Sequence, residues 1–281
     1  MRQFPADERP IAIQPELRRA QRACLAATPS PIVRLTRVYV VAALMPGSVV
    51  DLPRDTASHL AKVLRARDGD ELILFNGDGG EFLGTIEAVR GSRVSASVGE
   101  SRAVDRESPL RITLLQCVPR GDRMDLIVQK ATELGVARIV PALSQRSVVR
   151  LDRAQAESKL VHWRAVAVSA CEQCGRNRLP IIEAAQPLLH YLGEPATATA
   201  LRLVFEPESA PQAFGSALES GGAALGAVEI AIGPEGGFAS DELEAFRVAG
   251  FSQVGLGPRI LRTETAAIAA LVWLQTRFGD L

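Results

Sequence analysis

The spacing of apolar residues changes along the chain, and the change divides it into two regions. From residue 34 to about residue 98, short apolar runs alternate with polar positions, which is the period of half-buried strands. The segment Asn76-Gly-Asp-Gly-Gly80 is a strong turn signal between two such runs. The predicted elements are a helix over 55–63 and strands over 72–75, 81–89 and 93–98. Residues 34–104 are therefore expected to form a small β-rich domain of the barrel type.

From Leu110 onward, strand patterns alternate with helix patterns, which predicts an α/β domain with a parallel sheet covered by helices. Gly135 and Gly175 follow two of the helical patterns and are expected to end those helices. The predicted strands are 110–118, 137–141, 201–205, 227–232 and 251–256, and the predicted helices are 124–134, 153–174, one starting at Asp241 with Glu244 in its first turn, and 264–278. Residues 99–109 are charged and poor in apolar residues, so we expect a linker there and a second domain over 109–281.

The first 33 residues fit neither pattern. They lack the positive start and continuous apolar segment of a secretory signal. We expect a flexible extension over 1–33, with a short helix over 14–27. No apolar run in the chain approaches the roughly 20 residues that a membrane helix needs, so no membrane partner is expected.

The overall charge gives no sign of a nucleic-acid partner. The chain has 32 Lys and Arg residues and 32 Asp and Glu residues, a formal net charge of zero. An RNA-binding protein usually has a basic surface. The zero net charge therefore counts against RNA binding, although it still allows a local basic patch. Cys171 and Cys174 form a Cys-x-x-Cys pair without a second pair or a histidine cluster, and no metal is expected.

The strongest candidate for chemistry is a pair of glycine loops near the C-terminus. The apolar run 227–232 opens into Gly233-Pro-Glu-Gly-Gly-Phe238, and the predicted strand 251–256 opens into Gly257-Pro258. Loops at the carboxyl ends of parallel strands are where open α/β sheets bind ligands. The chain lacks the glycine motifs of phosphate-loop NTPases and NAD-binding folds. Pro234 and Glu235 stand where a polyphosphate needs bare N–H groups, so the loops favour a nucleoside.

These loops resemble a known family. Gly-Pro-Glu-Gly-Gly-Phe at 233–238 and Leu-Gly-x-Arg-Ile-Leu-Arg-x-Glu-Thr-Ala at 256–266 are similar to the SPOUT (trefoil-knot) methyltransferases, and more narrowly to the RsmE family of 16S rRNA uracil-N3 methyltransferases. The supporting segments, in the expected order, are 59–65, 121–125, 129–135, 145–148 and 171–176. The resemblance runs from about Arg34 to the C-terminus.

The resemblance implies a fold, a cofactor and the residues that hold it. It implies a PUA-like RNA-binding domain followed by a SPOUT domain with a deep trefoil knot, a feature that sequence patterns alone would never predict. It also implies S-adenosylmethionine (SAM) as the cofactor. The residues implied to bind it are Phe205, Glu206, Gly233, Pro234, Glu235, Gly236, Gly237, Leu256, Gly257, Ile260, Leu261, Arg262 and Thr265.

Methylation of uridine at N3 needs help with a proton, because N3 is weakly nucleophilic until that proton leaves. Arg262 and Glu264 lie beside the implied cofactor loop and are the candidate catalytic residues. A cation there would stabilise the uracil anion, and a carboxylate would act as a base. The alternative is that the two residues form an ion pair that only fixes the loop.

The resemblance further implies 16S rRNA of the small ribosomal subunit as substrate, in its decoding region, a homodimer formed through the last helix, and a cytoplasmic location. The candidate RNA-binding residues are Arg34, Arg37, His59, Lys62, Arg65, Arg146, Arg150, Arg176 and Arg178. Each alone is more often a solvated surface charge. Two alternatives stay open, namely a non-catalytic RNA-binding or ribosome-assembly protein and a SPOUT methyltransferase acting on another RNA.

Overall fold

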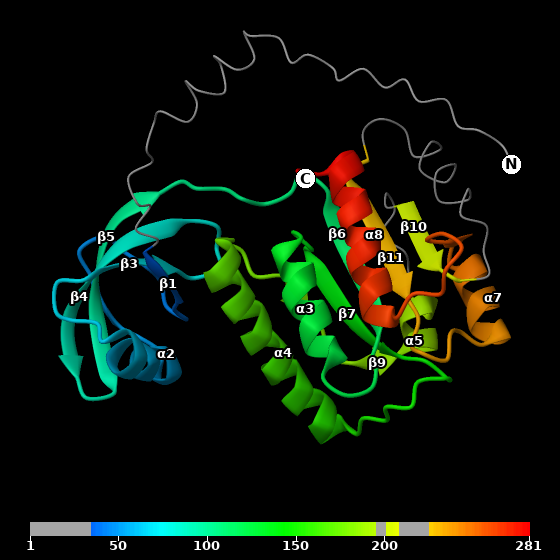
Figure 1. Ribbon diagram of the computed structural model, residues 1–281, viewed down its shortest axis with the longest axis horizontal. Coiled ribbons are helices and arrows are strands. Elements are labelled where there is room, and N and C mark those ends of the chain that lie inside the picture. The colour runs from blue at the N-terminus through cyan, green and yellow to red at the C-terminus, as the bar shows by residue number, and fades with distance from the viewer. Residues whose placement is uncertain (1–34, 195–200, 208–224) are drawn as a thin grey trace, which may run out of the picture. The chain divides into compact units, whose positions relative to one another are not determined.

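The computed structural model describes residues 35–194, 201–207 and 225–281 (Figure 1). The expected N-terminal extension, its helix and Arg34 lie outside the described residues. The remainder contains two sheets. The first is built from residues 36–102 and the second from residues 111–254.

The first sheet forms the small β domain. Its elements are β1 (Thr36–Tyr39), β2 (Val49–Asp51), α2 (Arg54–His59) with a π-helical turn (Leu60–Leu64), β3 (Glu71–Phe75), β4 (Glu81–Arg90) and β5 (Arg93–Arg102). The strand order is β1-β3-β4-β5-β2, with β1 parallel to β3 and the other neighbours antiparallel. Val94, Ala96 and Val98 are buried at alternate positions of β5, so the period of two predicted from sequence is confirmed.

Strand β5 extends further than the sequence predicted. Ser101 pairs with Phe82 and Arg102 with Glu81, so the last residues of β5 complete the ladder with the start of β4. The sequence pattern ended the strand at Val98 because the following residues are polar on both faces. Hydrogen bonding to β4 outweighs that pattern, and the connection between the sheets is shorter than expected.

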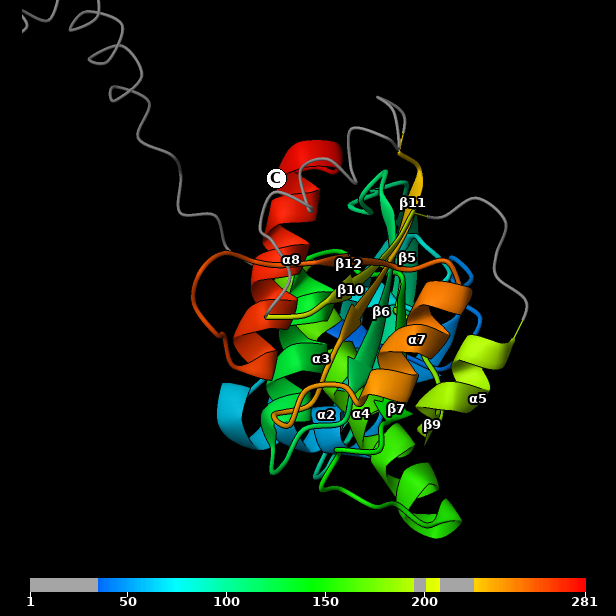
Figure 2. The same ribbon diagram turned by 90° about the vertical axis from the view of Figure 1, so that its right-hand side faces the viewer.

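The second sheet belongs to an α/β domain in which strands and helices alternate as predicted, although the short elements between residues 181 and 193 were not predicted. The elements of this domain are β6 (Arg111–Cys117), α3 (Arg123–Glu133), β7 (Arg138–Leu143), α4 (Arg153–Cys174), β8 (Ile181–Ile182), β9 (Gln186–Pro187), α5 (Leu188–Gly193), β10 (Leu201–Phe205), β11 (Ala227–Ile232), α7 (Ser240–Val248), β12 (Ser252–Val254) and α8 (Thr263–Phe278). The order β12-β10-β11-β6-β7-β8 is parallel throughout, and β9 also pairs with β7. Figure 2 shows α3 and α8 on one face of this sheet and α5 and α7 on the other.

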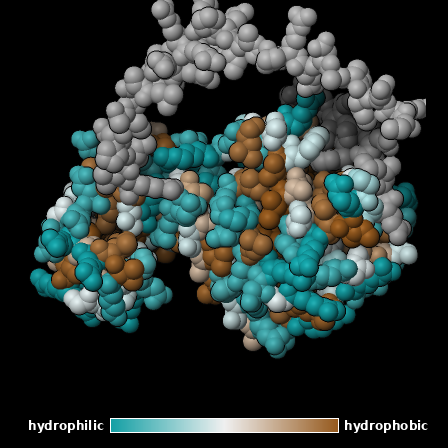
Figure 3. Space-filling view, in the orientation of Figure 1, coloured by the Kyte–Doolittle hydropathy of each residue, from teal (hydrophilic) through white to brown (hydrophobic). Residues whose placement is uncertain are grey.

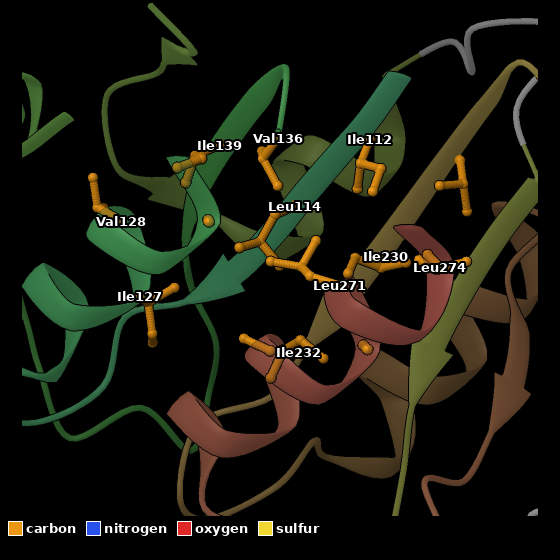
Figure 4. Packing of buried hydrophobic residues seen from close by; sticks show 14 of the residues in the cluster. Ile112, Leu114, Ile127, Val128, Val136, Ile139, Ile230, Ile232, Leu271 and Leu274 are labelled. Atoms are coloured by element: carbon orange, nitrogen blue, oxygen red, sulfur yellow. The ribbon is translucent and has the colours of Figure 1, made fainter. Parts of the chain in front are cut away.

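The core of the α/β domain lies between the sheet and its helices. Strands β6 and β11 alternate their side chains between the two faces. Figure 4 shows the face covered by α3 and α8. The buried residues it labels are Ile112, Leu114, Ile127, Val128, Val136, Ile139, Ile230, Ile232, Leu271 and Leu274. On the opposite face Leu115, Ala231 and Phe246 pack in a second cluster. Helix α8 is thereby fixed against the strands whose ends form the site.

The ends of α4 lie where the sequence predicted them, whereas α7 begins one residue earlier than predicted. Asp152 and Gln155 form a capping box at the start of α4, and Gly175 ends that helix with a φ of 94°. Helix α7 begins at Ser240 and not at Asp241, because the Glu242 carboxylate accepts the backbone N–H of Ala239 at 2.8 Å. Glu242, which forms this contact, is 1% exposed, and it was not among the residues from which the helix start was predicted.

Candidate cofactor and active site

A cavity lies at the carboxyl end of the parallel sheet. Strands β12, β10 and β11 are neighbours, and the segments that follow β10 and β11 meet the segment before α8. Together they enclose a cavity of about 270 Å³. Its lining residues are Phe205, Glu206, Pro207, Ile232, Gly233, Pro234, Glu235, Gly237, Phe238, Ile260, Leu261, Arg262, Thr263 and Ala266. A smaller hollow beside it is lined by Leu256, Gly257, Arg259, Leu261 and Ala266, together with the segment 205–207. The two predicted glycine loops therefore open on the same place.

Most of the predicted cofactor-binding residues line these two hollows, and two of them do not. Gly236 and Thr265 are absent from both linings. Gly236 lies instead beneath Arg146, whose Nη1 donates to the Gly236 carbonyl at 3.2 Å. Thr265 is exposed in the first turn of α8. The backbone of the glycine loop is thus tied to the loop after β7, outside the cavity.

Glycine is required at two positions of the cavity for different reasons. Gly257 has a φ of 113°, a conformation that residues with a side chain rarely adopt. A Cβ atom at Gly233 would lie 3.1 Å from the Phe238 ring, closer than most real contacts. Gly257 allows the turn, and Gly233 allows the Phe238 ring to pack closely against the glycine loop.

Two buried residues that the sequence did not single out hold the glycine loop in place. The Thr263 hydroxyl donates to the Gly233 carbonyl at 2.7 Å and accepts from Gln116 Nε2 at 2.9 Å. Gln116 is 0% exposed, and its Oε1 atom has no hydrogen-bond partner in the described part of the chain. This chain of bonds links the end of β6, the start of α8 and the end of β11. The family resemblance implied Thr265 as a cofactor-binding residue. In the structure it is the buried Thr263 that contacts the glycine loop.

The candidate catalytic residues do not pair with each other. Glu264 Oε1 lies 3.9 Å from Arg123 Nε, and Arg123 Nη1 also contacts Glu235 Oε1 at 2.6 Å. The second oxygen of Glu264 is buried, and none of the residues that the structure describes forms a hydrogen bond with it. Arg262 is exposed, lines the cavity, and has no ion-pair partner among the described residues. The ion pair considered from sequence is therefore replaced by one between Glu264 and Arg123 at the start of α3.

Several candidate RNA-binding residues are exposed. His59, Lys62 and Arg65 follow one another at intervals of three residues on α2 and its π-helical turn. Arg146, which lies over Gly236, and Arg178 are also exposed, as is Arg150, whose guanidinium donates to two carbonyls of its own loop. These residues are the exposed members of the predicted RNA-binding set.

Two other candidates, Arg37 and Arg176, are buried. The Arg37 guanidinium donates to Glu81 Oε2 at 2.6 Å and to Asn177 Oδ1 at 2.5 Å. Arg176 is 4% exposed and donates to Glu107 and to the carbonyls of helix α3 and the turn after it. Buried guanidinium groups need such acceptors. Both residues therefore form intramolecular hydrogen bonds and do not face a ligand in this structure. Their partners are too distant in sequence to be predicted.

The described residues give no sign of a metal or of a membrane span. In the part of the chain that the structure describes, no group of three or more histidine, cysteine or carboxylate side chains is placed to hold a metal ion. None of the helices described here is both long and apolar enough to cross a bilayer.

Comparison with protein families identifies both regions of the chain. Residues 106–275 match the model of an RNA methyltransferase domain, and residues 52–98 match that of an RNA methyltransferase PUA domain. Ribosomal RNA small subunit methyltransferase E of Buchnera aphidicola is 34% identical over 88% of this chain and 98% of its own length. The protein of the same name from Bacillus subtilis is 34% identical over 76% of this chain and 84% of its own length.

Solved structures show the same fold. A structure from Legionella pneumophila with bound SAM superposes with a TM-score of 0.82 at 38% identity, covering 89% of this chain and all of that one. Ribosomal RNA small subunit methyltransferase E from Neisseria gonorrhoeae, also bound to SAM, gives 0.78 at 36% identity and covers 88% and 99%. The expected architecture, a PUA-like domain followed by a SPOUT-type α/β domain, is thereby confirmed.

A PUA-like domain joined to a SPOUT-type α/β domain, with a cavity at the strand ends, defines a class of RNA methyltransferases. Within this class, the chain belongs to the RsmE family, the ribosomal RNA small subunit methyltransferases E.

Proposed function

We propose that this protein transfers the methyl group of SAM to N3 of a uridine in the decoding region of 16S rRNA, acting on the small ribosomal subunit. The observation that carries the proposal is the convergence of the segments after β10 and β11 with the start of α8 on one cavity. Apolar side chains such as Phe205, Ile232 and Phe238 line it together with the glycine loop, which suits a ligand with a flat apolar base and a few polar groups. The family relatives crystallised with SAM support the same ligand.

The residues of the cavity fit a nucleoside cofactor. Gly233 and Gly257 allow the close backbone approach, and Thr263 fixes the Gly233 carbonyl. The apolar side chains Phe205, Ile260 and Leu261 complete the walls. When bound, SAM supplies an activated methyl group on a sulfonium. The protein then has to hold the acceptor in line with that methyl, which is chiefly catalysis by proximity.

The remaining chemistry is removal of the N3 proton. We assign to Arg262 the stabilisation of negative charge on the uracil, because its guanidinium lines the cavity without an ion-pair partner among the described residues. We assign to Glu264 the acceptance of the proton. Its carboxylate has one oxygen near Arg123 and one that is buried without a hydrogen-bond partner among the described residues, and it lies beside the cavity, outside the residues that line it.

The RNA would be held by both domains. The β domain offers His59, Lys62 and Arg65, which are exposed on consecutive turns, and the α/β domain offers Arg146 next to the cofactor loop. Contacts to phosphates by such residues would make binding weaken as salt rises.

A homodimer formed through α8 is part of the proposal. Figure 3 shows an apolar strip on the face where α8 runs. Val272 is 40% exposed and Trp273 is 38% exposed, although α8 also supplies buried residues to the core. They border a shallow surface depression together with Ala269, Thr276 and Arg277. We further propose that the α/β domain contains the trefoil knot implied by the family resemblance. In the dimer, each active site would lie near the partner chain.

The test is single-turnover methylation of small ribosomal subunits that lack the modification, followed by nucleoside analysis by mass spectrometry. The expected product is 3-methyluridine at one position. Methyl on the ribose or on uracil C5 would refute the N3 assignment. SAM binding without methylation of any RNA would favour the alternative of a non-catalytic binder, and methylation of another RNA alone would change the substrate.

A further inference from the structure

The helix of the β domain ends in an irregular turn. Helix α2 continues into the π-helical turn Leu60–Leu64, and the carbonyl of Leu60 accepts the backbone N–H groups of both Arg65 and Ala66. Arg65 has a φ of 52°, and in the described part of the chain it is the single residue other than glycine with a positive φ. A side chain disfavours that conformation, and π-helical turns frequently lie at functional sites. The turn is therefore a candidate for a role beyond packing.

The π-helical turn changes which side chains face the core. Ala57 and Leu60 are buried, and in a continuous α-helix Leu64 would follow them on the same face, at spacings of three and four residues. A π-helical turn closes one residue later than an α-helical turn, so the residues at its end are rotated away from that face. Leu64 is 49% exposed, and Val63 beside it is 64% exposed. The backbone thus holds two apolar side chains in contact with solvent.

Cationic side chains flank these two apolar residues. Lys62 precedes them and Arg65 follows them, both are exposed, and neither forms an ion pair with a described residue. Residues 53–67 carry four cationic side chains and one anionic side chain, namely Arg54, Lys62, Arg65 and Arg67 against Asp55. Asp68 and Asp70, which come next, accept backbone N–H groups of the β domain. A chain with no net charge therefore has a local basic patch at this turn.

A single-stranded nucleic acid matches this combination of side chains. Its phosphates bind cationic groups, and its unstacked bases offer flat apolar faces. Leucine and other apolar side chains insert between bases where proteins unstack a nucleic acid. Residues 52–98, which contain the turn, match the PUA domain of RNA methyltransferases, so the nucleic acid that fits is RNA.

We propose that Val63 and Leu64 cover an unstacked base of the small-subunit rRNA, while Lys62 and Arg65 bind the phosphates beside it. This inference rests on the proposed function, because it takes rRNA as the substrate. It adds a base contact to the phosphate contacts assigned to this helix. It also accounts for the residue at position 65, where glycine would adopt the positive φ with less strain but would offer no cation.

The first test separates the apolar contact from the charges. The full-length protein is titrated at several salt concentrations against small ribosomal subunits that lack the modification. Leu64→Ser should weaken binding roughly tenfold without changing the salt dependence, because it removes half-exposed apolar surface and no charge. Lys62→Ala should reduce the slope of log affinity against log salt by about one, because one phosphate contact is lost. Val248→Ser, at a residue 74% exposed at the end of α7, is the control and should bind like wild type.

The outcomes of this titration separate the inference from the proposed function. If wild type binds the subunits and Leu64→Ser binds them equally well, the base contact at the turn is overturned and the rRNA substrate stands. If wild type does not bind the subunits, the rRNA substrate is overturned, and this contact with it. Neither result depends on which atom of the RNA is methylated.

The second test uses the strained backbone at position 65. Arg65→Gly and Arg65→Ala both remove the guanidinium, but only glycine adopts the positive φ without strain. Arg65→Gly should therefore unfold at a higher urea concentration than Arg65→Ala, while both variants bind the subunits more weakly than wild type. Weaker binding by the more stable variant would exclude misfolding as its cause. Binding of Arg65→Gly as tight as that of wild type would overturn the phosphate contact.

The third test identifies what lies against the turn. A photoreactive p-benzoylphenylalanine at position 64 should crosslink to rRNA nucleotides, which are mapped as stops of reverse transcription. SAM affinity, measured by calorimetry, should be the same in all these variants, because the turn supplies no residue to the cavity lining. Crosslinks to a ribosomal protein alone would make that protein the partner of the turn and would overturn the RNA contact.

Discussion

Replacement of Thr263 by valine should show how much the hydrogen-bond chain beneath the cavity contributes. Valine keeps the shape and the β-branch of threonine but removes the hydroxyl. The Gly233 carbonyl then loses its 2.7 Å donor, and Gln116 Nε2 loses its 2.9 Å acceptor. Gln116 keeps its bond to the Cys117 carbonyl, so two groups are left incomplete and not three.

The magnitude follows from the burial of these groups. Gln116 is 0% exposed and Thr263 is 5% exposed, so water cannot replace the lost partners at no cost. An unsatisfied buried group costs about 1–3 kcal/mol. Gln116 Nε2 is such a group, whereas Gly233 is half-buried and lines the cavity, where water can reach its carbonyl. Thr263→Val should therefore lower the free energy of unfolding by about 1–3 kcal/mol. Thr263→Ser keeps both hydrogen bonds and removes one methyl, which should cost about 1 kcal/mol.

The assay is urea unfolding of both variants, followed through the fluorescence of the buried Trp163, with SAM affinity measured by calorimetry. We expect Thr263→Val to weaken SAM binding at least tenfold and Thr263→Ser to change it less than threefold, because only the valine releases the Gly233 carbonyl. If serine and valine variants have the same stability and the same SAM affinity, the hydroxyl does not position the loop.

Four further predictions follow from the same structure. Gly257→Ala should weaken SAM binding through backbone strain of about 1–2 kcal/mol at a positive φ, and calorimetry that detects no change would contradict it. Arg262→Ala should raise the barrier of single-turnover methylation by roughly 2–4 kcal/mol with less effect on SAM affinity, whereas equal losses in both would make Arg262 a cofactor-binding residue. Burial alone would raise the pKa of Glu81, but Arg37 and Arg106 outweigh it and lower that pKa, so the carboxylate stabilises the fold above its ordinary pKa and loses this effect as pH falls through the lowered value. Glu81→Gln should therefore be less stable than wild type at pH 7 in urea unfolding, and the difference should shrink below about pH 4; a constant difference would exclude the charge as its cause. Val272→Arg should convert the dimer to monomers in sedimentation at micromolar concentration with little loss of stability, because this side chain is 40% exposed, and a wild-type protein that is itself monomeric would refute the dimer.

Local sequence determined most of the secondary structure. The limits of α4, β10 and β11 agree with those predicted, because each has a sharp boundary signal or a short buried apolar run. The place of the cavity could also be predicted, since glycine loops that follow parallel strands open at one edge of a sheet. These features depend on residues that are close together in the chain.

Tertiary structure decided which side chains hold the site together. Thr263 and Gln116 are 147 residues apart, and neither is distinctive alone. Arg37 and Arg176 are residues of a type that often contacts RNA phosphates. In the folded chain, however, their guanidinium groups donate to acceptors from distant segments. The partner of Glu264 is Arg123 of another helix and not its neighbour Arg262. A charged or polar side chain is satisfied by whichever group folding brings within hydrogen-bond distance, and sequence spacing carries no record of that distance.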